Sequence, residues 1–149
     1  MTKLYFTNNQ SKLVDIHTHL KECSDNFPTP LDSRVNLDQY SQKLFLHSKR
    51  FECWSDCKLV GLVAAYIECE KSRSFITNVT VSKDFYGKSI GKTLLLQLID
   101  YCRVLEIRVI ELDVEAINGY ALKIYSYLGF FISEQKDNNF IRLKIELSR

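Results

Sequence analysis

The sequence predicts an α/β fold with a mixed, mostly antiparallel sheet of about seven strands, about four flanking helices, and a single domain over residues 1–149. Short segments rich in β-branched residues alternate in polarity, which is typical of strands with one buried face. Longer segments repeat apolar residues at helical spacing. The 149 residues, 46% of them hydrophobic, are enough for one core.

One strand and two helices are predicted before residue 50. The strand covers residues 3–6, and a helix follows the polar cluster at 7–11. Its apolar face consists of Leu13, Ile16, Leu20 and Cys23. Residues 25–35 contain both prolines, so we expect an irregular extended loop. A loop of this length is either a binding element or a connection with no function of its own. A second helix starts at Asn36, with Gln39 in an approximate capping box.

Three consecutive strands are predicted next. Residues 51–54 and 59–68 form a hairpin, and a turn at 71–74 leads into residues 75–81. In the last strand Phe75, Thr77, Val79 and Val81 alternate with Ile76, Asn78 and Thr80. Tight connections between consecutive strands favour an antiparallel meander.

The rest of the chain alternates helices and strands. The longest helix carries an apolar stripe of Ile90, Leu94, Leu95, Leu98, Ile99, Cys102 and Leu105. A strand at 109–115 follows, with Glu111, Asp113 and Glu115 on one face; these carboxylates either include a general base or line a solvated edge or cleft wall. A helix from Asn118 to Gly129 precedes the final strands, 130–134 and 140–147.

Composition excludes several classes of function. The formal net charge is +2, and the 20 basic and 18 acidic residues are mixed, so no nucleic-acid partner is expected. No apolar run has the length of a membrane span, and the polar first residues do not resemble a signal peptide, so we expect a cytoplasmic protein that does not bind membranes.

Metal binding is not expected either. The five cysteines contain no C-x-x-C pair and are interpreted as reduced, mostly buried thiols. Cys53 and Cys57 could approach each other across a hairpin, but a zinc site would need two further ligands that the sequence does not place nearby. His17 and His19 are two residues apart, which points them to nearly opposite faces of a helix. We interpret them as a surface or half-buried pair, with one of them facing a ligand cleft as the alternative.

The loop at residues 87–92, Gly-Lys-Ser-Ile-Gly-Lys, lies where the long helix begins. Its backbone amides and the helix dipole favour an anion, most naturally a phosphate. A Walker phosphate loop ending in Gly91-Lys92-Thr93 would need glycine at position 86, which is Tyr86. A glycine loop that merely starts a helix is the third interpretation.

The same loop resembles the pyrophosphate loop of the GNAT acetyltransferases, Arg/Gln-x-x-Gly-x-Gly/Ala. Tyr86 takes the place of Arg or Gln, and Ser89 replaces the first motif glycine. Residues 112–130 resemble the second signature of that family, a strand that ends before Asn118, then Ala121, Tyr125 and a terminal Leu-Gly-Phe. The two motifs occur in the family's order and cover, with the elements between them, about half the chain.

The resemblance implies a splayed pair of strands in the middle of the sheet and a site for acetyl-CoA. The backbone of Val79 and Val81 would contact the pantetheine arm and the thioester carbonyl. The loop amides would hold the pyrophosphate, with charge from Lys88 or Lys92. The residues expected to bind the cofactor are Val79, Val81, Tyr86, Gly87, Lys88, Ser89, Ile90, Gly91, Lys92 and Asn118. Tyr125 would be the general acid, or else a core tyrosine on the apolar stripe.

The general base and the acceptor stay open. The glutamate that some family members carry would fall on Phe75, which cannot take a proton. A water held by Glu68, Asp113, His17 or His19 could serve, or the acceptor could arrive neutral.

We expect direct transfer, in a ternary complex, to an amine or hydroxyl of a small molecule. Residues 27–44 resemble small bacterial GNAT proteins associated with sugars, which suggests a sugar acceptor. A non-catalytic acyl-CoA sensor or interaction module, and a nucleotide-binding phosphate loop, are the alternatives. A homodimer is compatible with the sequence.

Overall fold

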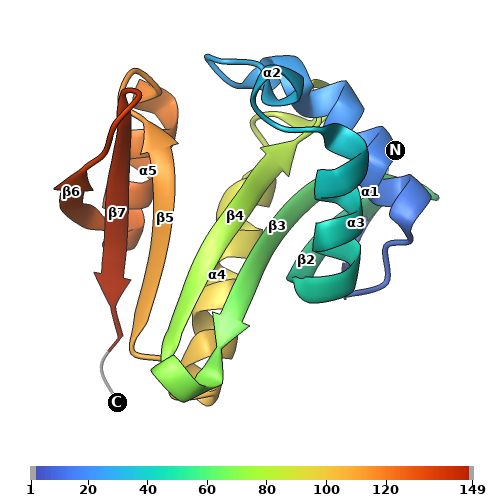
Figure 1. Ribbon diagram of the computed structural model, residues 1–149. Coiled ribbons are helices and arrows are strands. Elements are labelled where there is room, and N and C mark those ends of the chain that lie inside the picture. The colour runs from blue at the N-terminus through green and yellow to red at the C-terminus, as the bar shows by residue number, and fades with distance from the viewer. Residues whose placement is uncertain (1–2, 148–149) are drawn as a thin grey trace.

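Seven strands form one mixed sheet in the computed structural model, which describes residues 3–147 (Figure 1). The strands are β1 (Leu4–Asn8), β2 (Lys49–Ser55), β3 (Lys58–Glu68), β4 (Arg73–Val81), β5 (Val109–Glu115), β6 (Phe131–Gln135) and β7 (Phe140–Glu146). Their order across the sheet is β1-β2-β3-β4-β5-β7-β6. Only the β4–β5 pair is parallel, because α4 provides the crossover between them. The predicted α/β fold and mostly antiparallel sheet are therefore confirmed.

The helices cover both faces of this sheet. They are α1 (Leu13–Cys23), α2 (Leu31–Arg34), α3 (Leu37–His47), α4 (Ile90–Val104) and α5 (Gly119–Leu128). In Figure 1, α1 and α3 lie in front of the sheet, while α4 and α5 lie behind it. Two groups of buried side chains correspond to these faces: one contains Ile16, Leu20 and Leu44, and the larger one packs the sheet against α4 and α5.

The prediction of an irregular loop at residues 25–35 is wrong. A 3-10 turn, Ser24–Asn26, and the four-residue helix α2 lie in this segment. Pro30 is the N-cap of α2, a place where its missing N–H breaks no helical hydrogen bond. The Ser24 hydroxyl accepts a hydrogen bond from the backbone N–H of Asp32 at 2.9 Å and ties the turn to the helix. The proline pattern thus marks a helix start.

The apolar face of α1 also differs from its prediction. Leu13 is 38% exposed, whereas His19 is 1% exposed and lies beside Ile16, Leu20 and Cys23 on the buried face. His19 is therefore not part of a surface histidine pair. The sequence predicted a surface or half-buried position for His19, but its ring nitrogen has a buried hydrogen-bond partner, which offsets the cost of full burial.

A bulge and a divergence of strands open the middle of the sheet. The register of β3 against β4 passes from Ala64 opposite Asn78 to Ala65 opposite Ile76, so Thr77 is the extra residue of a β-bulge. β4 and β5 pair only from Arg73 to Ile76 and then separate. The splayed pair implied by the family resemblance is present, with β4 bent at Thr77.

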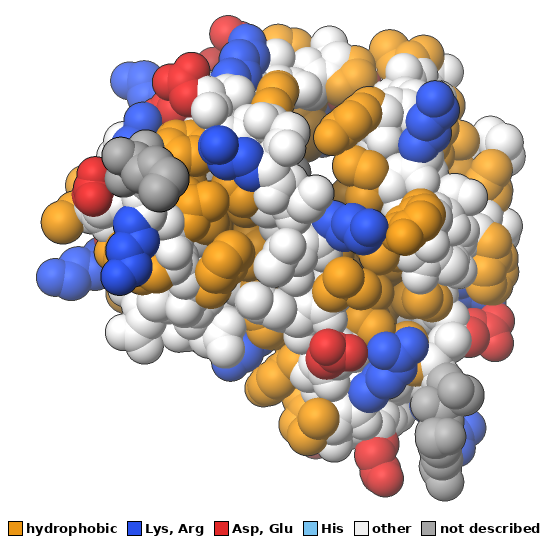
Figure 2. Space-filling model, turned by 180° about the vertical axis from the view of Figure 1, so that it is seen from behind, with side chains coloured by type: hydrophobic (Ala, Val, Ile, Leu, Met, Phe, Trp, Pro, Cys, Tyr) orange, Lys and Arg blue, Asp and Glu red, His pale blue; other side chains and the backbone are white. Residues whose placement is uncertain are grey.

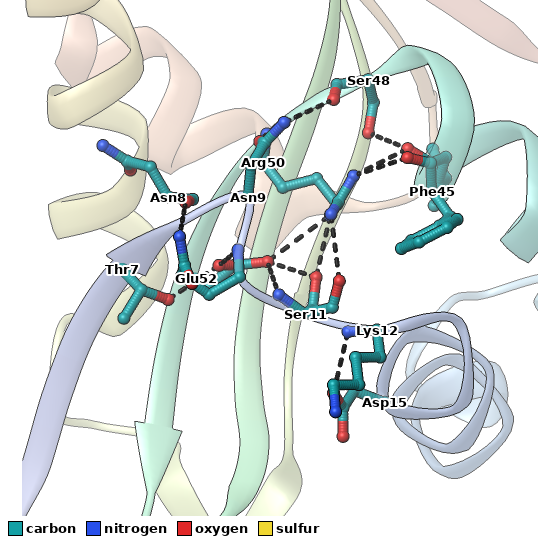
Figure 3. Close-up of polar contacts among 12 residues, drawn as sticks. Thr7, Asn8, Asn9, Ser11, Lys12, Asp15, Phe45, Ser48, Arg50 and Glu52 are labelled. Carbon is teal, nitrogen blue, oxygen red and sulfur yellow. Dashed lines mark hydrogen bonds and ion pairs between the residues drawn. The ribbon is translucent and has the colours of Figure 1, made fainter.

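A buried ion pair holds the front helices on the sheet (Figure 3). Arg50 and Glu52 are neighbours on β2, with 3.4 Å between Nε and Oε2, and both side chains are almost fully buried. Arg50 donates to the carbonyl of Leu44 near the end of α3 at 3.0 Å. Glu52 accepts from the backbone N–H of Ser11 at 2.8 Å, just before α1. The starting point of α1 and the end of α3 are thereby fixed to one strand.

Candidate active site

A cleft of about 740 Å³ lies where β4 and β5 diverge. Its walls are β4 from residue 76 to 81, β5 from 112 to 115, the loop before α4, the start of α5, and the segment 26–35. Figure 2, seen from the side of α4 and α5, shows hydrophobic side chains on both sides of a central hollow. Because these walls come from both faces of the sheet, a ligand on one face can meet a second ligand from the other.

Backbone groups of β4 point into this cleft. Ser82 donates its N–H to Val60 of β3 at 2.8 Å, and hydrogen bonding alternates along an antiparallel strand. The backbone groups of Val79 and Val81 therefore point away from β3, toward the gap. Asn26 donates its side-chain amide to the Val81 carbonyl at 3.0 Å, which leaves the Val79 groups available to a ligand.

The loop before α4 has the shape of an anion site. Gly87 has φ +82°, and Ser89 has φ 59° and ψ 27°, so Ser89 holds the left-handed conformation that usually requires glycine. Thr93 is the first residue of the helix whose N–H bonds to a preceding carbonyl, that of Ser89 at 2.9 Å. Within residues 3–147, the amides of residues 87–92 donate no hydrogen bond to a protein group, and they lie at the positive end of the helix dipole. The serine in place of glycine therefore preserves the loop geometry.

The expected cofactor residues line this cleft with one exception. Those that do are Val79, Val81, Tyr86, Gly87, Ser89, Ile90, Gly91, Lys92 and Asn118. Lys88 is exposed and outside the lining. Lys92 lies with Nζ 4.2 Å from the centre of the Tyr127 ring, a cation–π contact that restrains its charge near the loop. Asn118 caps α5 through its Oδ1, which accepts from the Ala121 N–H at 3.2 Å and leaves its side-chain N–H groups for a ligand.

A Walker-type role for Gly91-Lys92-Thr93 does not fit this geometry. In phosphate-loop proteins the Ser/Thr hydroxyl binds the magnesium ion of the nucleotide. Here the Thr93 hydroxyl donates to the Ser89 carbonyl at 2.8 Å and belongs to the first turn of α4. Among residues 3–147, no group of three or more His, Cys, Asp or Glu side chains could hold a metal ion.

Tyr125 is both a core residue and a wall of the cleft. It is 7% exposed and packs edge-on against Phe130, with ring centroids 5.7 Å apart. Burial raises the pKa of Tyr125 well above its ordinary value, because the phenolate would be poorly solvated. The hydroxyl therefore keeps its proton at neutral pH. Within residues 3–147 the Tyr125 hydroxyl makes no hydrogen bond, so it is available as a donor to a ligand.

Four side chains were candidates to hold a water that acts as the general base, and three of them lie outside the cleft. Glu68 ends β3 at the opposite end of β4 and pairs with Arg73 at 3.0 Å. His17 pairs with Asp38 on α3 at 2.8 Å, and His19 is enclosed between α1 and the sheet. Burial lowers the pKa of His19 to about 4. None of these side chains can meet a substrate in the cleft.

Asp113 lies in the cleft and forms a bidentate pair with Arg142 of β7 at 2.7 and 2.9 Å. Arg142 also lies 5.4 Å above the ring of Phe75, so Phe75 packs beneath this ion pair. Glu115 is buried and accepts from the N–H and hydroxyl of Thr29 at 3.0 and 2.7 Å. The carboxylates of β5 that face the cleft are thus already engaged.

Sequence reasoning did not identify Asn78 as a site residue. The His19 Nε2 lies 2.8 Å from the Thr80 hydroxyl, and that hydroxyl donates to the Asn78 Oδ1 at 2.8 Å. Since Thr80 uses its proton toward Asn78, neutral His19 donates to Thr80. The chain of bonds fixes the Asn78 side chain at the cleft wall. The only signal in the sequence was a pair of polar residues on the buried face of a strand.

In the described part of the chain, no helix has the length and apolar character needed to cross a membrane. All five cysteines are free, with Cys23, Cys53 and Cys102 buried and Cys57 and Cys69 exposed.

Comparison with known proteins relates this geometry to a family. Residues 13–130 match the model of the acetyltransferase (GNAT) family. The ribosomal protein bS18-alanine N-acetyltransferase of Escherichia coli strain K12 is 24% identical over 105 residues, which cover 67% of this chain and 70% of that protein.

Solved structures agree in fold. The ribosomal-protein-S18-alanine N-acetyltransferase from Escherichia coli aligns with a TM-score of 0.78 and 16% identity, covering 100% of this chain and 96% of that one. The PaiA N-acetyltransferase from Thermoplasma acidophilum, in complex with coenzyme A, aligns with a TM-score of 0.76 and 16% identity, covering 96% and 99%.

The cleft suits the coenzyme of this family chemically. Unpaired amides at a helix N-terminus match a diphosphate, and a free strand edge between apolar walls matches the amides of a pantetheine arm. Since the family model spans most of the chain, the protein belongs to the GNAT acetyltransferase family and is an acetyl-CoA-dependent acetyltransferase.

Proposed function

We propose that the enzyme transfers the acetyl group directly to a primary amine, with both substrates bound in the β4–β5 cleft. The observation that carries this proposal is that the cleft passes between the two faces of the sheet, with the free backbone groups of Val79 along its wall. The coenzyme would enter from the face of α4 and α5, and the acceptor from the face of α1 to α3.

The residues of the chain would act in the following way. The amides of residues 87–92 hold the diphosphate, and Asn118 adds a contact at the start of α5. When bound, acetyl-CoA supplies an activated acyl carbon with a thiol as its leaving group. The Val79 N–H stabilises the negative charge that develops on the carbonyl oxygen, since it is a fixed donor in a partly desolvated cleft. The new C–N bond forms as the C–S bond breaks, and Tyr125 gives its proton to the departing sulfur.

Asp113 is the side chain that we assign to deprotonation of the amine. It is the member of the predicted set that reaches the cleft, and its pair with Arg142 fixes its position there. An ionised carboxylate with one lone pair free can hold a water, and this water can accept the proton that the amine loses. Replacing Asp113 with Asn should therefore weaken turnover most at low pH, where fewer amines arrive neutral.

The amine at the start of a peptide chain is the acceptor class that we favour. The curated relative is named for acetylating an alanine of a ribosomal protein. The cleft supports a peptide over the sugar suggested by residues 27–44, because sugar hydroxyls need free acceptor groups. Glu115 is bonded to Thr29, and Asp113 is paired with Arg142 and, in this proposal, holds the water that takes up the amine proton. The acceptor half instead offers the aromatic rings of Phe27, Tyr40 and Phe140.

The test is thiol release from acetyl-CoA in the presence of an alanyl peptide, an aminosugar or a polyamine. We expect the highest kcat/KM with the peptide. A higher value with the aminosugar would overturn the peptide assignment. Binding of acetyl-CoA with no amine-dependent thiol release from any acceptor would favour the non-catalytic sensor that the altered loop suggested.

A further inference from the structure

Arg34 places a guanidinium at the acceptor end of the cleft. It is the last residue of α2, its side chain is exposed, and it lines the cleft. Its Cζ lies 5.1 Å from the ring centre of Phe27 and 5.6 Å from that of Phe140. Phe27 precedes α2, whereas Phe140 begins β7 on the far side of the gap. The guanidinium therefore bridges two walls of the cleft and is held by both.

The positive charge of Arg34 is not neutralised within the described structure. Ion pairs among residues 3–147 involve other cations, and Arg34 takes part in none of them. Its one hydrogen bond to the described residues runs from Nε to the Thr29 carbonyl at 3.3 Å. The two carboxylates in the same cleft are engaged elsewhere: Asp113 with Arg142, and Glu115 with Thr29. The terminal N–H groups of Arg34 thus remain available.

The two cation–π contacts and the free terminal N–H groups together favour a planar anion. Aromatic rings hold a guanidinium by its faces and leave the N–H groups around its edge free. Two parallel N–H groups on that edge match the two oxygens of a carboxylate. Arg34 is also held in place before a ligand arrives, so less side-chain entropy is lost on binding.

We infer that Arg34 is a specificity-determining residue that binds a carboxylate of the acceptor, so that the preferred acceptor is an amine whose own molecule carries a carboxylate. This inference rests on the proposed function, in which the amine acceptor binds the part of the cleft lined by Phe27, Tyr40 and Phe140. For a peptide acceptor, the group is an aspartate or glutamate side chain near the amine that receives the acetyl group. A neutral acceptor would gain no charge-assisted hydrogen bond from Arg34.

The experiment compares short alanyl peptides with amidated ends, matched in length, that carry glutamate, glutamine or phosphoserine at the second or third position. Binding to the enzyme saturated with coenzyme A is measured by calorimetry, and turnover is measured as kcat/KM. Wild type should bind the best glutamate peptide at least about tenfold more tightly than its glutamine counterpart. In Arg34→Gln this ratio should fall to about one, and Arg34→Lys should keep part of it.

Arg108→Gln is the matched control, since it removes the same charge from an exposed arginine outside the cleft lining and should preserve the ratio. Equal binding of glutamate and glutamine peptides by wild type would overturn the inference, as would a ratio unchanged in Arg34→Gln. Tighter binding of the phosphoserine peptide would replace the carboxylate with a phosphate. Because binding is measured without turnover, loss of the proposed amine acetylation and loss of the carboxylate preference give separate results.

Discussion

At the scale of single residues, the chemistry depends on polar groups whose protonation is set by burial. Tyr125 keeps its proton because its surroundings are apolar, and His19 stays neutral for the same reason. The first can serve in catalysis because it borders the cleft. His19 holds the side chain of Asn78 in place through Thr80 and does not itself line the cleft.

Tyr125→Phe should lower kcat about a hundredfold, because general acid catalysis contributes roughly that factor or more. The ring that packs against Phe130 is retained, so the fold and the KM for acetyl-CoA should change little. Steady-state kinetics and a thermal melt measure both effects. Tyr127→Phe is the control, since Tyr127 lies on the same helix, is 74% exposed and does not line the cleft, and phenylalanine keeps the ring that contacts Lys92. Unchanged kcat in Tyr125→Phe would remove this residue from the mechanism.

His19 should make the protein less stable as the pH falls from 6.5 toward 4. Its folded pKa, about 4, is below the value of 6.5 for the free side chain, so the unfolded chain binds the extra proton in that window. Between pH 6.5 and 5 the free energy of unfolding should fall by roughly 1–2 kcal/mol from this group. Urea melts of His19→Gln, which lacks the titration, should show a smaller loss. Equal losses in both proteins would contradict the assignment.

At the scale of elements, the buried pair of Arg50 and Glu52 ties the front helices to β2. Glu52→Gln leaves Arg50 charged and buried without its partner, and we expect a loss of about 3–5 kcal/mol in the free energy of unfolding. Glu22→Gln breaks the exposed pair with Lys58 and should cost about 1 kcal/mol or less. Chemical denaturation compares the two variants. A loss for Glu52→Gln no larger than that for Glu22→Gln would show that this pair does not anchor the helices.

Local patterns were enough to predict the strands and the main helices, because alternation and helical spacing reflect the two buried faces. The helix α2 was missed, since prolines indicate breaks and helix starts alike. The bulge at Thr77 depends on register against β3, and the partners of Asp113 and Glu115 come from β7 and the segment before α2. Contacts between segments far apart in the sequence cannot be predicted from the local spacing of residues. The loop before α4 was found because its chemistry is contiguous in the sequence.

At the scale of the whole molecule, the sheet divides at the β4–β5 gap, and each half supplies one wall of the cleft. Figure 1 shows α4 behind β3 and β4, and α5 behind β5 and β7. The first turns of both helices line the cleft. The single-domain boundary, the cytoplasmic location and the homodimer stay predictions. The proposed mechanism requires that acetyl-CoA occupies the β4–β5 gap and no other surface.

An amide NMR titration of the labelled protein with acetyl-CoA tests that requirement most directly. We predict large shifts for the amides of Val79, Val81 and residues 87–92, which form the free strand edge and the unpaired helix start. The amides of residues 68–73, at the opposite end of β4, should stay unchanged and serve as the internal control. Shifts confined to other surfaces, or none at saturating acetyl-CoA, would contradict the placement of the coenzyme in the cleft.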